Sequence, residues 1–515
     1  MKHNLQTELL TSKNMHSFPM VFFDTFLLFL SLILIIKRYS NASTTKNSPP
    51  SPPTLPLIGN LHQLGLLPHR TLHSLAQKYG PLMLLHFGKV PALVVSSAEA
   101  AREVMKTHDL VVSDRPQSKV WKILFYDTKD MASASYGKSW RNLRSLSVCH
   151  LFSSKKVQSF GRVREEETLR MMGHIKKCCS SSLQVNLSEL LGLLSNDVIC
   201  RVALGRRYRG VEGKGFERVL LEFDELVGTV SIGDYMPWLD WLSKVNGLYG
   251  RAKRVAKYLD QFLDEVIDEH ISGGSRNSKD GLEAERDFVD VLLSLEKTDT
   301  EGFPVDRNVI KGLIVDMFVA GTETTHATME WAMTELLKHP IVMHKLQNEV
   351  RSVVGNKTHV TEDDLGQMKY LKAVIKETFR HHPSVPVIPR KSSEDIKVNG
   401  YDIAAGTQVL VNVWAIGRDP SSWYQPLEFN PERFLNNSID FKGHDFELIP
   451  FGAGRRGCPG MLFAIATIEM VIANLVHQFD WALPCGEDLN MSENPGMAIL
   501  RKFPLMAVAT LHDRN

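Results

Sequence analysis

Residues 450 to 460 have the sequence PFGAGRRGCPG, and two kinds of chemistry compete for this stretch. Gly452, Gly454 and Gly457 have the GxGxxG spacing of a turn that holds the phosphates of a dinucleotide. Cys458 is instead suited to be the thiolate ligand of a metal cofactor. Backbone N–H groups of a glycine-rich loop and the start of a following helix would help to keep its sulfur ionised.

The dinucleotide interpretation leaves much of the stretch unexplained. Pro450 stands where a central parallel strand should end, and too few residues follow Gly460 to build the rest of such a domain. Arg455, Arg456 and Pro459 crowd a turn in which a phosphate needs bare backbone. The stretch therefore favours a cysteine ligand.

The cysteine interpretation also explains the neighbours of Cys458. Glycines let the chain approach a flat macrocycle closely, and an arginine beside the cysteine can neutralise a haem propionate. The pattern F-x-x-G-x-R-x-C-x-G resembles the haem-thiolate signature of the cytochrome P450 superfamily, and its five specified residues are Phe451, Gly454, Arg456, Cys458 and Gly460. The resemblance covers nearly the whole chain, and it implies that Cys458 is the axial ligand of haem iron.

A second motif, AGTETT, lies in an apolar segment that is expected to be a helix over 308 to 338. Asp316, Ala320 and Thr324 fall on one face of this helix at four-residue spacing. Burying the polar side chains of Glu323 and Thr324 in a helix costs free energy, so we expect these side chains to have a function. The resemblance implies that this pair loosens the helix over the haem and delivers protons to dioxygen there. The alternative is a threonine-rich stretch that bonds its own carbonyls.

Two further motifs support the resemblance. KETFR supplies Glu377 and Arg380, and PERF supplies Arg433. An E-x-x-R pair alone is common on helix surfaces. In this order before the cysteine loop, however, the three residues resemble the structural triad of the family, which implies that they brace the loop and take no part in catalysis.

The propionate groups of the haem have their own candidates. Trp140 and Arg144 match the W-x-x-x-R motif of the family and share a helix face, where an indole N–H and a guanidinium can grip a propionate. An ordinary amphipathic helix would give the same spacing. Arg390 in VIPRK aligns with another propionate arginine.

The elements that must position these residues are mainly helical. Helical periodicity covers 97–107, 138–150, 160–177, 215–228, 250–271, 308–338, 341–354, 368–381 and 460–478. The expected strands are LMLLHFG, ALVVSS and GTQVLVNVWA, and residues 272–287 are an expected polar surface loop. Strands do not alternate regularly with helices, so we expect a mainly α fold with small β-sheets, of the cytochrome P450 type, in one large domain over 57–515.

The N-terminal region is expected to attach this domain to a membrane. After a lead of residues 1–17, residues 18–36 carry one charge and are just long enough to span a bilayer. The basic and proline-rich linker 37–56 follows, and its charges place the body in the cytosol. We therefore expect a single-pass anchor in the endoplasmic reticulum, the alternative being a cleaved signal peptide. Met15 is an alternative start.

Charge and cysteine content restrict the class of partner. Lysine plus arginine is 60 against 58 acids, which gives no argument for a nucleic acid partner. The six cysteines form no CxxC motif and no disulfide framework, as expected of a reducing compartment.

The resemblance implies a monooxygenase of the plant microsomal branch, which inserts one oxygen atom from O2 into a small hydrophobic specialised metabolite. The candidates are phenolic, coumarin-like and terpenoid molecules. Electrons would come from NADPH through a flavoprotein reductase, because no flavin or nicotinamide domain fits in the chain. An oxygen-independent haem-thiolate isomerase or dehydratase, and a non-catalytic haem-binding protein, are the alternatives.

The expected substrate pocket is largely apolar. Its candidate residues are Met317, Val385, Val387, Met497 and Ala498. Two of the pocket segments depart from the usual plant pattern. RHHPSVPVIPR has His381 for leucine and Ser384 for proline. Near the end of the chain, Met497, Ala498, Ile499 and Leu500 stand where the branch often has Leu-Thr-Val-His, so the resemblance selects no single substrate.

Overall fold

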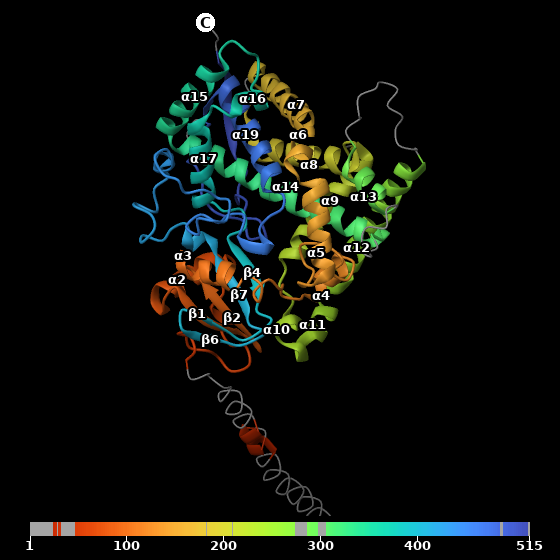
Figure 1. Ribbon diagram of the computed structural model, residues 1–515, viewed down its shortest axis with the longest axis vertical. Helices are drawn as coiled ribbons and strands as arrows, with labels where there is room; N and C mark the ends of the chain where they lie inside the picture. The colour runs from red at the N-terminus through yellow and green to blue at the C-terminus, as the bar shows by residue number, and fades with distance from the viewer. Residues whose placement is uncertain are drawn as a thin grey trace, which may run out of the picture.

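The structure, a computed structural model, describes residues 24–27, 29–31, 47–181, 183–208, 210–272, 286–296, 305–484 and 488–512, without the side chains of 210–217 (Figure 1). The predicted lead 1–17, most of the predicted anchor 18–36, most of the predicted polar loop and Cys485 lie outside the described residues.

Helices dominate the described chain. They are α2 (Pro68–Tyr79), α3 (Ala98–Arg102), α4 (Lys119–Leu124), α5 (Lys138–Leu146), α6 (Ser154–Ser159), α7 (Gly161–Ser180), α8 (Leu187–Leu204), α9 (Gly210–Gly228), α10 (Ile232–Tyr235), α11 (Asp240–Val245), α12 (Leu248–Ser272), α13 (Phe288–Glu296), α14 (Arg307–Lys338), α15 (Pro340–Val354), α16 (Glu362–Leu365), α17 (Lys369–His381), α18 (Val413–Ile416) and α19 (Met461–Gln478). Short π turns are Glu103–Thr107 and Ser147–Leu151, and short 3₁₀ turns are Leu61–Gln63, Pro237–Leu239, Pro431–Phe434 and Gly454–Arg456. The predicted fold class is confirmed, and the predicted long helices are present.

Helix α8 is an element that the sequence analysis missed. It is buried on most of its circumference, so its apolar residues show no one-sided periodicity. Its ends carry the usual signals, because the Asn186 side chain accepts a hydrogen bond from the Glu189 N–H and Gly205 ends the helix with φ 71°. Capping residues would have been the signal to find it.

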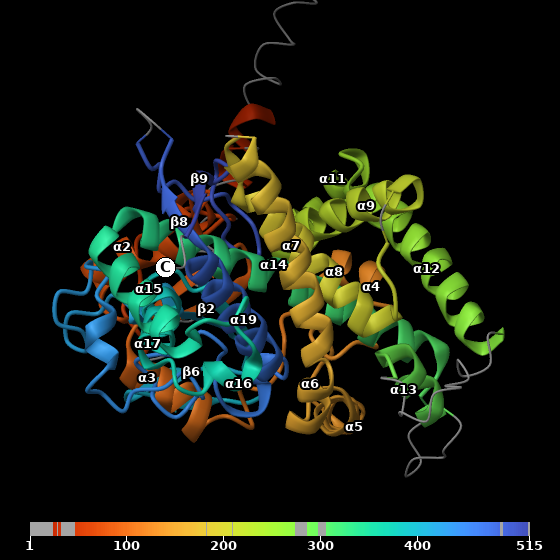
Figure 2. The same ribbon diagram turned by 90° about the horizontal axis from the view of Figure 1, so that it is seen from above.

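Helix α14 crosses the middle of the molecule, with α8, α17 and α19 packed around it (Figures 1 and 2). Asp306 caps its start and accepts a hydrogen bond from the Val309 N–H at 2.8 Å. Most of its residues are buried, which fits an apolar sequence without a polar face. A central buried helix of this length can carry site residues to the interior.

Three small sheets complete the fold. The largest has the order β1 (Leu82–Phe87), β2 (Val90–Val95), β7 (Gln408–Asn412) and β4 (Val387–Lys391), in which only β2 and β7 pair in parallel. It lies beside α2 and α3, away from α12 and α13 (Figure 1). The smaller sheets are β3 (Val185–Asn186) with β9 (Met506–Leu511) and β8 (Phe479–Ala482), and β5 (Ile396–Val398) with β6 (Tyr401–Ile403). The predicted strand GTQVLVNVWA ends early, because the Asn412 side chain caps α18.

The described part of the predicted linker 37–56 packs on the folded body. The Asp402 N–H donates to the Asn47 carbonyl at 2.9 Å, and the Leu84 N–H donates to the Pro50 carbonyl at 2.9 Å. The folded body therefore includes the second half of that linker.

Among the described helices, only α19 is long and apolar enough to cross a membrane. Its residues are 67% buried inside the protein, where it packs against α14. Burial of this kind marks α19 as a core helix.

Candidate active site

The cysteine loop has a backbone that requires glycine at two positions. Gly452 and Gly454 have φ of 68° and 66°. A Cβ at Gly454 would also overlap the Asp109 carboxylate, which accepts the next N–H of the loop at 3.1 Å. The Cys458 N–H donates to the Phe451 carbonyl at 2.9 Å and closes the loop. The loop thus points Cys458 inward at the start of α19.

The GxGxxG motif does not lie in a dinucleotide-binding unit. Residues 445–450 form turns instead of a strand, and the strand after α19 is the antiparallel β8. The glycines shape the cysteine loop instead, as the sequence analysis favoured.

The Cys458 thiol is accessible from an internal cavity and lies deep inside the protein. Burial raises its pKa, while the N–H of Gly460, the Arg144 charge and the N–H of Met461 act in the opposite direction. These donors and this cation are the groups that stabilise a thiolate once a metal ion displaces the proton.

The cavity has a volume of about 490 Å³ and brings most predicted site residues together. Those that line it are Trp140, Arg144, Met317, Ala320, Thr324, Val385, Val387, Arg390, Phe451, Arg456, Cys458, Gly460 and Met497. Ala498 is buried outside it, although its neighbours Met497 and Ile499 line it. The prediction for Ala498 is therefore corrected, because the chain bends over residues 496–498 and buries this side chain away from the cavity.

Arginines surround the cysteine end of the cavity. Both terminal nitrogens of Arg390 are buried without a hydrogen-bond partner in the described chain. Burial, and then the charges of Arg115 and Arg456, hold the pKa of Arg390 well below its usual range. Arg144 lines the same cavity. A buried cluster of like charges requires an anion, and haem propionates meet that requirement. Arg115 carries no motif that the sequence analysis could have used.

Two predicted propionate residues have other partners. The Trp140 indole N–H donates to the Met131 carbonyl at 3.0 Å. All three donor nitrogens of Arg456 bond backbone carbonyls, including that of Met131 at 3.2 Å, and its guanidinium stacks on Trp140. Of the predicted propionate residues, Arg390 and Arg144 therefore remain available to an anion at the cavity.

The Thr324 hydroxyl lies on the cavity, and α14 is uninterrupted where it was expected to loosen. Thr324 Oγ1 donates to the Ala320 carbonyl at 2.5 Å, and Thr328 Oγ1 donates to the Thr324 carbonyl at 2.9 Å. Ser384 Oγ lies 2.9 Å from Thr328 Oγ1 and donates to the Thr324 carbonyl at 3.1 Å. The hydroxyl protons are thus bonded to carbonyls, mostly of the helix itself. The lone pairs of the Thr324 hydroxyl remain able to accept a hydrogen bond from another molecule, such as water.

Glu323 does not face the cavity with Thr324, because successive helix residues are about 100° apart. Its carboxyl meets that of Asp224 from α9. Burial, followed by the Glu323 charge, raises the pKa of Asp224 to about 9, and burial also raises the pKa of Glu323. The two carboxyls therefore share a proton at neutral pH. The sequence analysis missed Asp224, which lies in no motif.

Asp316 is a further carboxyl on the cavity. Its Oδ2 accepts a hydrogen bond from the Met131 N–H at 2.7 Å, and its carboxyl also meets the buried carboxyl of Asp130. Burial, and then the charge of Asp130, raise the pKa of Asp316 well above its usual value. Asp316 and Asp130 thus form a buried carboxyl pair beside the cavity that holds a proton.

The predicted triad residues meet in the interior. Glu377 accepts from Arg380 Nε and Nη2 at 2.7 Å each, and from Arg433 Nε at 3.1 Å. The side chains of Glu377 and Arg380 are 0% exposed. Arg380 also bonds the Gly417 carbonyl, and Arg433 bonds the Tyr424 carbonyl. The triad thus holds the segment before the cysteine loop.

The contact from this segment to the cysteine loop is aromatic. The ring centroids of Phe379 and Phe451 lie 5.1 Å apart, and those of Phe441 and Phe451 lie 5.8 Å apart. Phe379 belongs to α17, the helix that carries Glu377 and Arg380. The triad therefore reaches the loop through Phe379.

Comparisons with known proteins agree with this geometry. The chain is 56% identical to cytochrome P450 736A117 of Prunus mume, covering 94% of this chain and 95% of the relative. It is 48% identical to cytochrome P450 71A22 of Arabidopsis thaliana (96% and 99%) and 48% identical to norfluorocurarine oxidase of Strychnos sp (93% and 96%).

A solved zebra fish cytochrome P450 with progesterone superposes with a TM-score of 0.73 at 28% identity, covering 87% of this chain and 100% of that one. The family model "Cytochrome P450" matches residues 49–507. A cysteine loop at the cavity, a central helix beside it and a match along almost the whole length agree, and this chain therefore belongs to the cytochrome P450 family of haem-thiolate monooxygenases.

Proposed function

We propose that this monooxygenase inserts one oxygen atom from O2 into a small hydrophobic plant specialised metabolite. The observation that carries the proposal is the cavity of about 490 Å³, which joins Cys458, the α14 hydroxyls and a largely apolar wall. Such a cavity selects by shape and apolar contact and orients by few polar groups.

The residues around Cys458 fit haem. Cys458 would supply the axial thiolate, Arg144 and Arg390 would pair with the propionates, and Gly460 would let the chain pass close to the ring. Haem, when bound, supplies the oxidising chemistry that replaces a C–H bond by C–OH. The protein determines which carbon reacts by holding it close to that centre.

We assign the movement of protons to two groups on neighbouring positions of α14. The Thr324 hydroxyl holds a proton donor, such as an ordered water, on the cavity side. Glu323 and Asp224, on the side of α14 away from the cavity, store the proton that replaces the one donated at Thr324. This proton reaches Thr324 through water or through a rotamer change of Glu323. This arrangement favours dioxygen chemistry over an oxygen-independent isomerisation, which would not need a proton supply.

The wall of the cavity would hold the substrate mainly by apolar contact. The wall residues Met317, Val385, Val387 and Met497 would enclose its apolar part.

Electrons would come from NADPH through a separate membrane flavoprotein reductase, which is the general arrangement in the cytochrome P450 family. A single-pass anchor at residues 18–36 would hold the chain in the endoplasmic reticulum with the body in the cytosol. Both proteins would then meet at one membrane surface.

The test is a reconstitution of the full chain with a plant reductase, NADPH and a panel of phenolic, coumarin-like and terpenoid molecules. We expect an oxygenated product whose formation requires NADPH, reductase and O2, with the new oxygen derived from ¹⁸O2. Turnover of a substrate without NADPH or O2 would identify an isomerase or dehydratase instead. Spectral binding of ligands without any turnover of the panel would favour a binding protein.

A further inference from the structure

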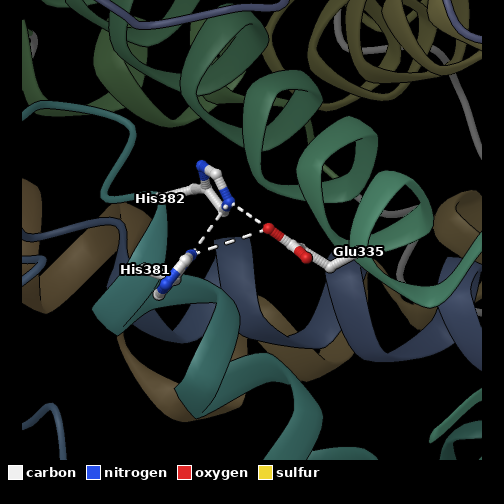
Figure 3. A group of neighbouring side chains, drawn as sticks. All are labelled: Glu335, His381 and His382. Carbon is white, nitrogen blue, oxygen red and sulfur yellow. Dashed lines mark hydrogen bonds and ion pairs between the residues drawn. The ribbon is translucent and has the colours of Figure 1, made fainter. Parts of the chain in front are cut away.

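A group of imidazoles and one carboxylate lies outside the cavity, where the ends of α14 and α17 meet. Glu335 is in the last turn of α14, His381 ends α17, and His382 follows it (Figure 3). His381 is the residue at which the sequence departs from the leucine of the plant pattern. The proposed monooxygenase reaction uses none of the three.

The three ligand atoms form a compact triangle. Glu335 Oε1 lies 2.7 Å from His382 Nε2 and 3.6 Å from His381 Nδ1, and the two ring nitrogens lie 3.3 Å apart (Figure 3). Ligand atoms at zinc bond lengths of about 2.0–2.1 Å in a tetrahedral site are roughly 3.3 Å apart. The triangle thus has the size of one face of such a site.

Groups on the sides away from Glu335 fix the orientation of both imidazoles. His381 Nε2 lies 3.1 Å from the Leu427 carbonyl, to which only an N–H can donate, so Nδ1 carries the lone pair that faces the group. The His382 ring stacks on Trp331 with centroids 4.1 Å apart and planes at 4°. Support of this kind is what orients histidine ligands in metal sites.

The carboxylate lies among three imidazoles. Glu335 is 0% exposed, and its Oε1 faces His381 and His382. On the other side, Oε2 lies 3.2 Å from His339 Nδ1, within ion-pair distance. The group therefore offers Oε1, and not Oε2, to a cation.

We propose that Glu335, His381 and His382 bind a borderline divalent cation, best represented by Zn²⁺, which joins the ends of α14 and α17. Two imidazoles with one carboxylate favour zinc over calcium or magnesium, which prefer oxygen ligands. The charges of Arg418 and Arg380 act against a dication here, and the Glu493 charge acts for it. His339 has a 32% exposed side chain and marks the approach from solvent.

The test uses full-length holoprotein without a polyhistidine tag, treated with a chelator and titrated with Zn²⁺. Calorimetry and elemental analysis should give one Zn²⁺ per haem, and Zn²⁺ should raise the thermal midpoint. His381→Leu should weaken binding at least about tenfold and abolish the thermal shift. His381→Gln, which can still donate to the Leu427 carbonyl, serves if the leucine variant loses haem.

The control is His270→Leu, since His270, Asp287 and Asp290 form the other described group of this kind. It should leave the one-to-one binding unchanged. The absence of saturable binding to the wild type, binding by His381→Leu as tight as wild type, or loss of binding in His270→Leu instead would each overturn the proposal.

Discussion

At the scale of single residues, the proposed haem ligation rests on Cys458. We expect Cys458→Ala to lose the reduced carbon-monoxide band typical of thiolate ligation, because no other described cysteine lines the cavity. The measurement is the reduced carbon-monoxide difference spectrum with haem content per protein. Cys149→Ala is the control, since Cys149 is exposed away from the cavity and should keep the band. A Cys458→Ala protein with an intact band would refute the assignment.

Thr324 tests the proposed movement of protons. Thr324→Ala should still bind haem and substrate but release hydrogen peroxide instead of product. The reason is that no hydroxyl would then position the proton-donating water at the cavity. General acid–base contributions run ~10²–10⁴-fold, so the product rate should fall by tens at least, with water acting as a partial substitute. The measurement is the ratio of product formed to NADPH consumed.

Thr328→Ala is the matched control, because its hydroxyl makes the same bond to the carbonyl four residues earlier. It should change the product ratio far less. An unchanged ratio in Thr324→Ala would assign Thr324 to helix packing.

The Asp224–Glu323 pair predicts a dependence of stability on pH. The folded protein keeps a proton on Asp224 up to about pH 9, whereas the unfolded chain releases it above about pH 4. The folded state therefore binds more protons in this window, and the free energy of unfolding should fall as pH rises through it, by at most about 1.4 kcal/mol per pH unit.

Asp224→Asn removes the extra proton, so its loss of stability from pH 6 to pH 8.5 should be smaller than that of the wild type. Urea unfolding followed by haem absorbance at both pH values measures the difference. Equal losses in the two proteins would show that the pair does not hold a proton in the folded state.

At the scale of elements, the triad links α17 to the segment before the cysteine loop. Glu377→Gln removes the buried carboxylate that pairs with Arg380 and Arg433. Breaking a buried ion pair costs roughly 3–5 kcal/mol, so we expect low haem retention and a lower thermal midpoint. Arg162→Gln, in an exposed pair with Glu166, should change the thermal midpoint little. Full haem retention in Glu377→Gln would contradict the bracing role.

At the scale of the whole molecule, the anchor should be separable from the body. Removal of residues 1–45 takes away the predicted span and keeps Asn47, whose carbonyl bonds Asp402 in the body. We expect a folded haem protein with an unchanged carbon-monoxide band and weaker membrane association, measured by fractionation of membranes. Loss of haem on truncation would show that the anchor region contributes to the fold.

The sequence by itself determined the features that depend on neighbouring residues. Cys458, its glycines and the following helix lie within a short stretch, so their common role was visible without tertiary structure. The long helices were visible for the same reason, because a helical face repeats every three to four residues. Helix α8 was not predicted, because burial on most of its sides removes that repeat of apolar residues.

Tertiary structure alone decided which distant groups meet. The partner of Glu323 is Asp224 on another helix, the charge cluster at the cavity includes Arg115, and His381 reaches Glu335 only where α14 and α17 end together. Rotation along α14 separated Glu323 from Thr324, although the two are adjacent in sequence. Burial then set the protonation of these groups, since the pKa of a carboxyl or guanidinium depends on the atoms that surround it after folding.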